Sequence, residues 1–136
     1  MNDLEFTTDR FLPFLPEDCQ ANPGVYGFEL ALWLSQALAR AGLFTSYPMG
    51  EDWGWFIEYI EGEAEVMIGC SSQCEAGDGY GGRPVTWHVF IEPRRSFKQW
   101  LKRQPAESTI AAKLRTNIVA ALRSEGIEVN AGGESG

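Results

Sequence analysis

The sequence predicts a single α+β domain, in which an antiparallel β-meander carries helices packed on one face in the order β-α-β-β-β-α-α. Its length of 136 residues suits one compact domain rather than two. Apolar residues alternate at period two in the middle of the chain and recur at helical spacing before and after it. The links between the central strands contain no crossover helix, so neighbouring strands should run antiparallel.

The first twenty residues predict a short strand and an extended apolar arm. Leu4 and Phe6 alternate with polar residues, which is typical of a strand with one buried face. Pro13 and Pro16 then exclude a helix interior. The apolar residues around them should therefore lie extended against the core.

A long amphipathic helix is expected over residues 24–41. Asn22 and Pro23 are typical of a helix start, as the N-cap and the first helical residue. Gly42 is typical of a helix end. The buried stripe should consist of Leu30, Trp33, Leu34, Ala37, Leu38 and Ala41.

Three strands follow, and the first two form a hairpin that turns at Glu61 and Gly62. The hairpin strands are expected over residues 51–60 and 63–70, and the third strand over 85–91. Side chains at period two should share one face. These sets are Trp53, Trp55, Ile57 and Tyr59; Ala64, Val66 and Ile68; and Val85, Trp87, Val89 and Ile91. The aromatic residues either fill the core or line a ligand pocket.

The last third should be helical. Ser96 and Gln99 fit a capping box that opens a short helix, which Pro105 interrupts. A second helix is expected over about 106–124, and residues 127–129 are suited to a terminal edge strand. The domain should span residues 1–130, with residues 131–136 as a disordered tail.

Charge is unevenly distributed along the chain. Residues 1–80 hold 14 Asp and Glu against two Arg, a net charge of −12, whereas residues 81–136 hold nine Lys and Arg against five Asp and Glu, a net charge of +4. An acidic surface repels phosphate, which argues against direct nucleic-acid binding and favours a basic protein partner. The alternative is an acidic composition that serves only solubility.

The sequence also indicates a compartment. No apolar run approaches the roughly 18 residues of a membrane span, so no membrane partner is expected. The acidic N-terminus is unlike a signal peptide. A soluble cytoplasmic protein is therefore expected.

Residues that carry chemistry are few. Cys19, Cys70 and Cys74 are odd in number, so a disulfide framework is not expected and the thiols should be reduced. A metal site formed by Cys70, Cys74 and His88 with Asp78 is the alternative, although structural zinc usually takes two closely spaced pairs of ligands. The sequence therefore assigns no catalytic residue, no metal ligand and no cofactor.

A partner-binding surface is predicted where acidic and aromatic residues meet. The loop 77–82 matches G-x-G-x-x-G but leads into a strand, so it lacks the helix N-terminus that binds phosphate. Glu51 and Asp52 are adjacent and point to opposite faces of a strand, which argues against cooperation in acid/base catalysis. The predicted contact residues are Glu51, Asp52, Trp53, Trp55, Glu58, Glu61, Glu63, Asp78 and Tyr80.

Three stretches carry a resemblance. LPED at residues 15–18, YGFELALWL at 26–34 and EDWGW at 51–55 together resemble a set of small, functionally uncharacterised bacterial α+β proteins. The chain is also similar in style to the immunity proteins of bacterial polymorphic-toxin systems, which are single acidic α+β domains without catalytic motifs. The resemblance covers roughly residues 11–93. It implies an antitoxin-like inhibitor and assigns no role to any numbered residue.

Three functions follow from these observations. The first is a non-catalytic protein-binding domain, in its most specific form an immunity inhibitor of a basic toxin. The second is a small-molecule or metal-dependent enzyme that uses His88 with nearby Asp and Cys residues. The third is a self-associating adaptor, for example a homodimer, in which the acidic part of one chain meets the basic part of another.

Overall fold

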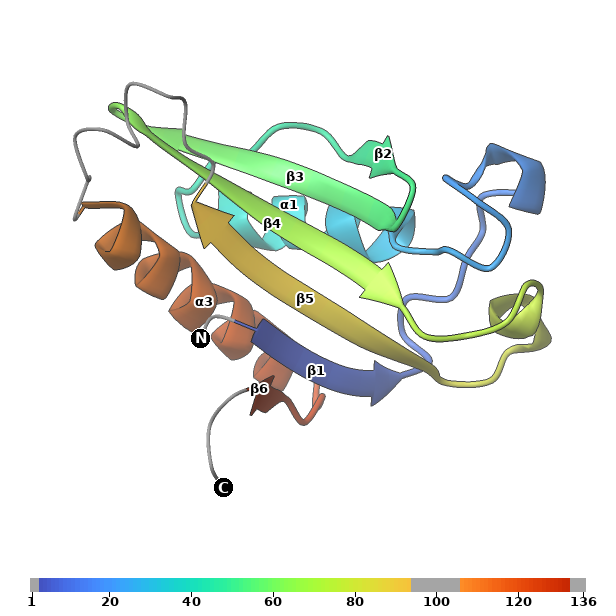
Figure 1. Ribbon diagram of the computed structural model, residues 1–136. Coiled ribbons are helices and arrows are strands. Elements are labelled where there is room, and N and C mark those ends of the chain that lie inside the picture. The colour runs from blue at the N-terminus through green and yellow to red at the C-terminus, as the bar shows by residue number, and fades with distance from the viewer. Residues whose placement is uncertain (1–2, 94–105, 133–136) are drawn as a thin grey trace.

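A computed structural model describes residues 3–93 and 106–132 as a six-stranded antiparallel sheet with two helices against one face (Figure 1). The α+β class and the placement of the helices on one side of an antiparallel sheet are thereby confirmed. The strand order is β2-β3-β4-β5-β1-β6. The strands are β1 (Asp3–Thr8), β2 (Met49–Glu51), β3 (Gly54–Glu61), β4 (Ala64–Ser72), β5 (Val85–Pro93) and β6 (Asn130–Gly132).

The helices are α1 (Phe28–Arg40) and α3 (Ala106–Ser124), and two short 3₁₀ turns, η1 (Glu17–Cys19) and η2 (Asp78–Gly81), lie in the connections. The helix predicted over about 106–124 is confirmed as α3. The short helix expected between Ser96 and Pro105 lies outside the described residues. Within the described ranges, neither α1 nor α3 combines the length and apolar character that crossing a bilayer requires.

The core lies between the sheet and the helices. Strands β3, β4 and β5 form the predicted meander, with Ile57 paired to Ile68 and Ile68 to Ile91 across the ladder. All three isoleucines point to the helices and are buried. The apolar arm is also confirmed, since Phe11 and Pro13 are buried.

Helix α1 begins at Phe28, four residues later than the predicted start. Asn22 does not cap it: the Asn22 side-chain amide donates a hydrogen bond to the Asp52 carbonyl, 2.9 Å away, and a tight turn returns the chain at Val25. The residue before the helix is Gly27. The buried face of α1 is also rotated relative to the predicted stripe. Leu30, Leu34 and Leu38 are fully enclosed, as predicted, whereas Trp33 is half-buried at the margin of the core.

Short edge strands complete the sheet at both sides. Residues 49–51 form β2, an edge strand that was not predicted, so residue 51 belongs to β2 and not to the first hairpin strand expected over 51–60. The terminal strand occupies Asn130–Gly132, not 127–129, and pairs with β1. It therefore includes two residues of the segment expected to be a disordered tail. Ile127 is instead buried beneath the end of α3.

Candidate protein-binding surface

The sheet has one face on which no described helix packs, and we call it the open face. Figure 1 shows it towards the viewer, with α1 and α3 behind the strands. Alternation along each strand determines which side chains point there. In β5, for example, Trp87 and Val89 point to the helices and are buried, so His88 and Phe90 point to the open face.

Three aromatic rings form a cluster on the open face. The Trp53 ring centroid lies 5.0 Å from that of Phe90 and 6.3 Å from that of Phe56. Gly69 is on β4, which lies between the strand of Phe56 (β3) and the strand of Phe90 (β5). A Cβ at Gly69 would lie 2.2 Å from the Phe90 ring. The glycine therefore lets the Phe90 ring lie directly on the backbone. Trp53 remains 37% exposed and its neighbour on the edge strand, Met49, 36%.

Carboxylates border this aromatic cluster. None of the six strands contains a Lys or Arg, so the sheet carries no permanent positive charge. On the open face the imidazole of His88 lies beside a carboxylate, with Nε2 3.8 Å from an oxygen of Asp3. The strand carboxylates that point to this face are Asp3, Glu5, Glu51, Glu58, Glu65 and Glu92.

The structure separates two of the predicted contact residues, Trp53 and Trp55. Asp52 and Trp53 form the two-residue turn between β2 and β3, where strand alternation does not hold. Trp53 consequently folds onto the open face. Trp55 points to the helices and packs edge-on against Phe28, with ring centroids 5.3 Å apart. The prediction that both tryptophans share a face is therefore wrong.

The Glu61 side chain points to the helix side of the sheet and is hydrogen-bonded there. Lys113 of α3 donates a hydrogen bond to Glu61 Oε1 at 2.8 Å, and the Tyr59 hydroxyl donates to the same atom at 2.6 Å. The Lys113 ammonium lowers the pKa of Glu61, and the hydrogen bond to Glu61 raises the pKa of Tyr59 to about 12. Glu61 is thus a structural link between sheet and helix, whereas Glu63 lies in the exposed turn beyond it.

Asp78 and Tyr80 lie in a loop that is tied to the N-terminal arm. The Tyr80 hydroxyl donates to the Leu15 carbonyl, and Asp78 pairs with Arg83 at 3.3 Å. The loop also packs on Tyr26, whose hydroxyl accepts a hydrogen bond from Gly77 N at 2.7 Å. Burial raises the pKa of Tyr26 to about 12. These contacts give the loop a structural role, and they do not join it to the Trp53 cluster.

The residues of the alternative enzyme site are not brought together. Cys70 is fully buried on the helix side, where burial raises the pKa of its thiol, whereas His88 points to the open face. The Cys74 thiol lies near Ser72 Oγ at 3.6 Å. Within residues 3–93 and 106–132, no group of three His, Cys, Asp or Glu side chains is arranged to hold a metal ion. The described cysteines are all free thiols.

Sequence reasoning missed Phe56, Phe90 and Met49 as members of the site. A signal was present, because Phe56 and Phe90 occupy the strand positions that alternate with the predicted core residues. Large aromatic side chains at such outward positions indicate a second apolar face. Of the predicted residues, the structure brings Glu51, Trp53 and Glu58 to this face.

Comparison with known proteins assigns the chain to no family. The likeness to bacterial immunity proteins over residues 11–93 therefore stays a prediction. No protein-family model matches this chain, and no curated protein or solved structure matches it.

Proposed function

We propose that this protein is a non-catalytic binding domain that holds a basic partner protein against the open face of its sheet. The observation that supports the proposal is the position of the Trp53–Phe56–Phe90 cluster within a border of carboxylates, on a sheet without Lys or Arg.

The two components of the surface have separate roles. Acidic side chains attract a basic partner at long range, which raises the association rate and disfavours acidic competitors. Exposed Trp53 and Met49 supply apolar area that a partner can cover. Buried aromatic anchors usually contribute most of the affinity, because they lose the most contact with water. An acidic face also repels phosphate, so a protein partner is favoured over a nucleic acid.

The resemblance narrows the proposal further. An immunity-type inhibitor works by occupying the surface of a toxin, and it needs stoichiometric binding without chemistry of its own. We infer that the partner is a basic bacterial toxin and that the pair meets in the cytoplasm. Free cysteines in the described residues, with Cys19 exposed, fit such a reducing compartment.

The test begins with capture of the partner from the source cell and measurement of its binding by calorimetry. Trp53→Ala should weaken binding by about thirtyfold, as expected for an anchor residue worth about 2 kcal/mol. Phe44→Ala is the matched control, since Phe44 is an exposed aromatic residue beside α1. It should leave the affinity unchanged.

A second pair of variants tests the charge. Glu65→Lys on the open face should slow association, and Glu128→Lys, an exposed carboxylate outside the strands, should do so much less. Binding should saturate at a fixed molar ratio. Continuing turnover of a substrate, abolished by His88→Ala in a folded variant, would refute the proposal. Unchanged affinity for the partner in Trp53→Ala would refute it as well.

A further inference from the structure

His88 is the only histidine of the chain, and it lies on the open face beside the aromatic cluster. Its ring centroid is 5.8 Å from that of Phe90, and the Phe90 ring contacts Trp53. The His88 side chain is 38% exposed, so it can exchange protons with solvent. Imidazole is the side-chain group that changes its charge between about pH 5 and pH 8. The open face therefore contains one group of the type that responds to pH near neutrality.

Strand β1 supplies the charged groups that face His88. The imidazole Nε2 lies 3.8 Å from a carboxylate oxygen of Asp3, and Glu5 is directly opposite His88 across the ladder. On the other side, β4 places Ser71 opposite His88, and its hydroxyl carries no charge. Glu92 is the next carboxylate of β5 itself, four residues further along the strand. In the six strands of the described sheet, the imidazole is thus faced by carboxylates and by no Lys or Arg.

The two protonation states of His88 present different surfaces to a basic partner. When the imidazole is neutral, the carboxylates of Asp3 and Glu5 can interact with Lys and Arg side chains of the partner. When the imidazole is protonated, its positive charge pairs with Asp3 and repels the same side chains. The binding of a basic partner should therefore be stronger above the pH range in which the imidazole titrates and weaker below it.

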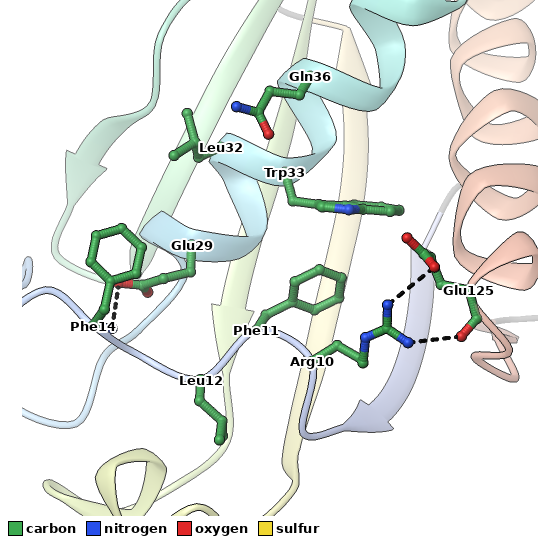
Figure 2. A pocket seen from close by; sticks show the side chains of 9 residues that line it. All are labelled: Arg10, Phe11, Leu12, Phe14, Glu29, Leu32, Trp33, Gln36 and Glu125. Atoms are coloured by element: carbon green, nitrogen blue, oxygen red, sulfur yellow. Dashed lines mark hydrogen bonds and ion pairs between the residues drawn. The ribbon is translucent and has the colours of Figure 1, made fainter.

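The helix side of the sheet provides a position for comparison, in a pocket between the N-terminal arm and α1 (Figure 2). The pocket has a volume of about 280 Å³, and Trp33 and Gln36 line it together with charged residues. Arg10 pairs with Glu125 at 3.1 Å, and Glu29 Oε2 accepts hydrogen bonds from two backbone N–H groups of the arm, both at 3.1 Å. Gln36 is exposed, so an imidazole placed there would titrate away from the open face.

We propose that His88 makes the open face a pH-sensitive surface, which binds a basic partner at neutral pH and holds it more weakly once the imidazole is protonated. This regulation rests on the proposed function, because it requires a basic partner on the open face. A single charge added to an exposed interface should weaken binding by about fivefold. By linkage, binding of the partner should in turn oppose the protonation of His88 to the same extent.

The test uses acetylated hexalysine amide as the probe, because lysine side chains keep their charge between about pH 5.5 and pH 7.5. Calorimetry at low ionic strength should show about fivefold weaker binding at the lower pH in the unaltered chain. His88→Gln should bind hexalysine with similar affinity at both pH values. The double variant His88→Gln/Gln36→His moves the imidazole to the helix side (Figure 2), and it should not restore the pH dependence.

A second measurement needs no substitution. The unaltered chain has one imidazole, so its proton resonance reports on His88 alone. Saturating hexalysine should lower the pH at the midpoint of this titration by about 0.7, which corresponds to the fivefold change in affinity. An unmoved midpoint would overturn the proposal. An equal pH dependence in His88→Gln, or no saturable binding of hexalysine at pH 7.5, would overturn it as well.

The captured partner distinguishes a failure of this regulation from a failure of the proposed function. An affinity that falls in Trp53→Ala but has the same pH dependence in His88→Gln as in the unaltered chain would remove the regulation and leave the binding surface. An affinity that is unchanged in Trp53→Ala would instead remove the binding surface itself. Restored pH dependence in the double variant would show that net charge matters and the position of His88 does not, which would also contradict the proposal.

Discussion

Two glycines approach the carbonyl oxygen of Cys70, and neither position has room for a side chain. A Cβ at Gly54 would lie 2.3 Å from this oxygen, and one at Gly27 would lie 2.7 Å from it. Their φ angles of +158° and +150° also disfavour other residues. Gly54 opens the strand that follows Trp53, so the course of the chain around the aromatic cluster depends on it.

We expect Gly54→Ala to lower the free energy of unfolding by about 3 kcal/mol, because an overlap with backbone adds to the strained φ. Gly62→Ala is the control, since Gly62 has a φ of +64° but no atom within 4 Å of its Cβ position. That variant should cost only about 1 kcal/mol. Urea denaturation measures both. Equal costs would mean that the Cys70 carbonyl moves aside easily.

Two buried tyrosines should make the fold sensitive to alkali. Tyr26 and Tyr59 have pKa values of about 12 in the folded protein, against 10.0 in an exposed tyrosine. Between these values the unfolded chain loses protons that the folded chain retains. The stabilisation is therefore fully present below pH 10 and is lost as the pH rises towards 12.

The urea midpoint should accordingly fall between about pH 10 and pH 11, and Tyr59→Phe should make this fall shallower by removing one of the two groups. Tyr47→Phe is the matched control, since Tyr47 is exposed and has no hydroxyl contact in the described structure that would be lost. An equally steep fall in Tyr59→Phe would show that Tyr59 ionises normally in the folded state.

At the level of elements, α1 shows how a helix can be found in a sequence while its orientation is not. The 3.6-residue period predicts α1 and its leucines correctly, but it also places Trp33 in the core. Trp33 is instead half-buried, with its ring against Phe11 of the arm. The arm fills the space beside the helix, and its path depends on the buried Glu29, which no periodicity indicates.

Leu34→Ala should therefore cost about 3 kcal/mol, as expected for a fully buried leucine, and Trp33→Ala clearly less. The reason is that Leu34 leaves a closed cavity, whereas Trp33 lines a pocket that already reaches the surface. Equilibrium unfolding of both variants measures the difference. A larger loss for Trp33→Ala would return Trp33 to the core and weaken the assignment of the pocket.

The sheet was predictable where strands are long and pair with the next strand along the chain. Period-two alternation is sufficient for β3, β4 and β5, because each is joined to the next by a connection without a helix. It is not sufficient for β2 and β6, which have three residues each and pair only because a longer strand lies beside them. Trp53 was misplaced for the same reason, since the turn that carries it exists only if β2 does.

Across residues 3–93 and 106–132, the sheet and helix α3 differ in charge. The strands hold carboxylates and no Lys or Arg, and Lys113 and Arg123 are on α3, behind the sheet. Stacking of one chain's open face on another's helix layer would give the self-associating adaptor. Arg10, Arg83 and Lys113 are already paired with carboxylates of their own chain, which weakens this possibility.

We expect the protein to remain a monomer at low ionic strength. Light scattering at low and high salt checks this, because an assembly held by charge would grow as salt is removed. A mass that rises at low salt would favour the adaptor over the basic-partner proposal. Glu65→Lys would then show whether the open face is the surface involved, since it should reverse the rise.

The position of β1 inside the sheet has a consequence for biosynthesis. Leu4 pairs with Val89 on one side and Ala131 on the other, so β1 receives its two neighbours only after β5 and then β6 have been synthesised. The local meander can form earlier, but β1 must wait with Leu4 and Phe6 exposed to water. Such distant pairings slow folding, and an unpaired strand is a template for aggregation. A nascent chain halted before residue 85 should consequently depend on a chaperone that covers its N-terminal strand.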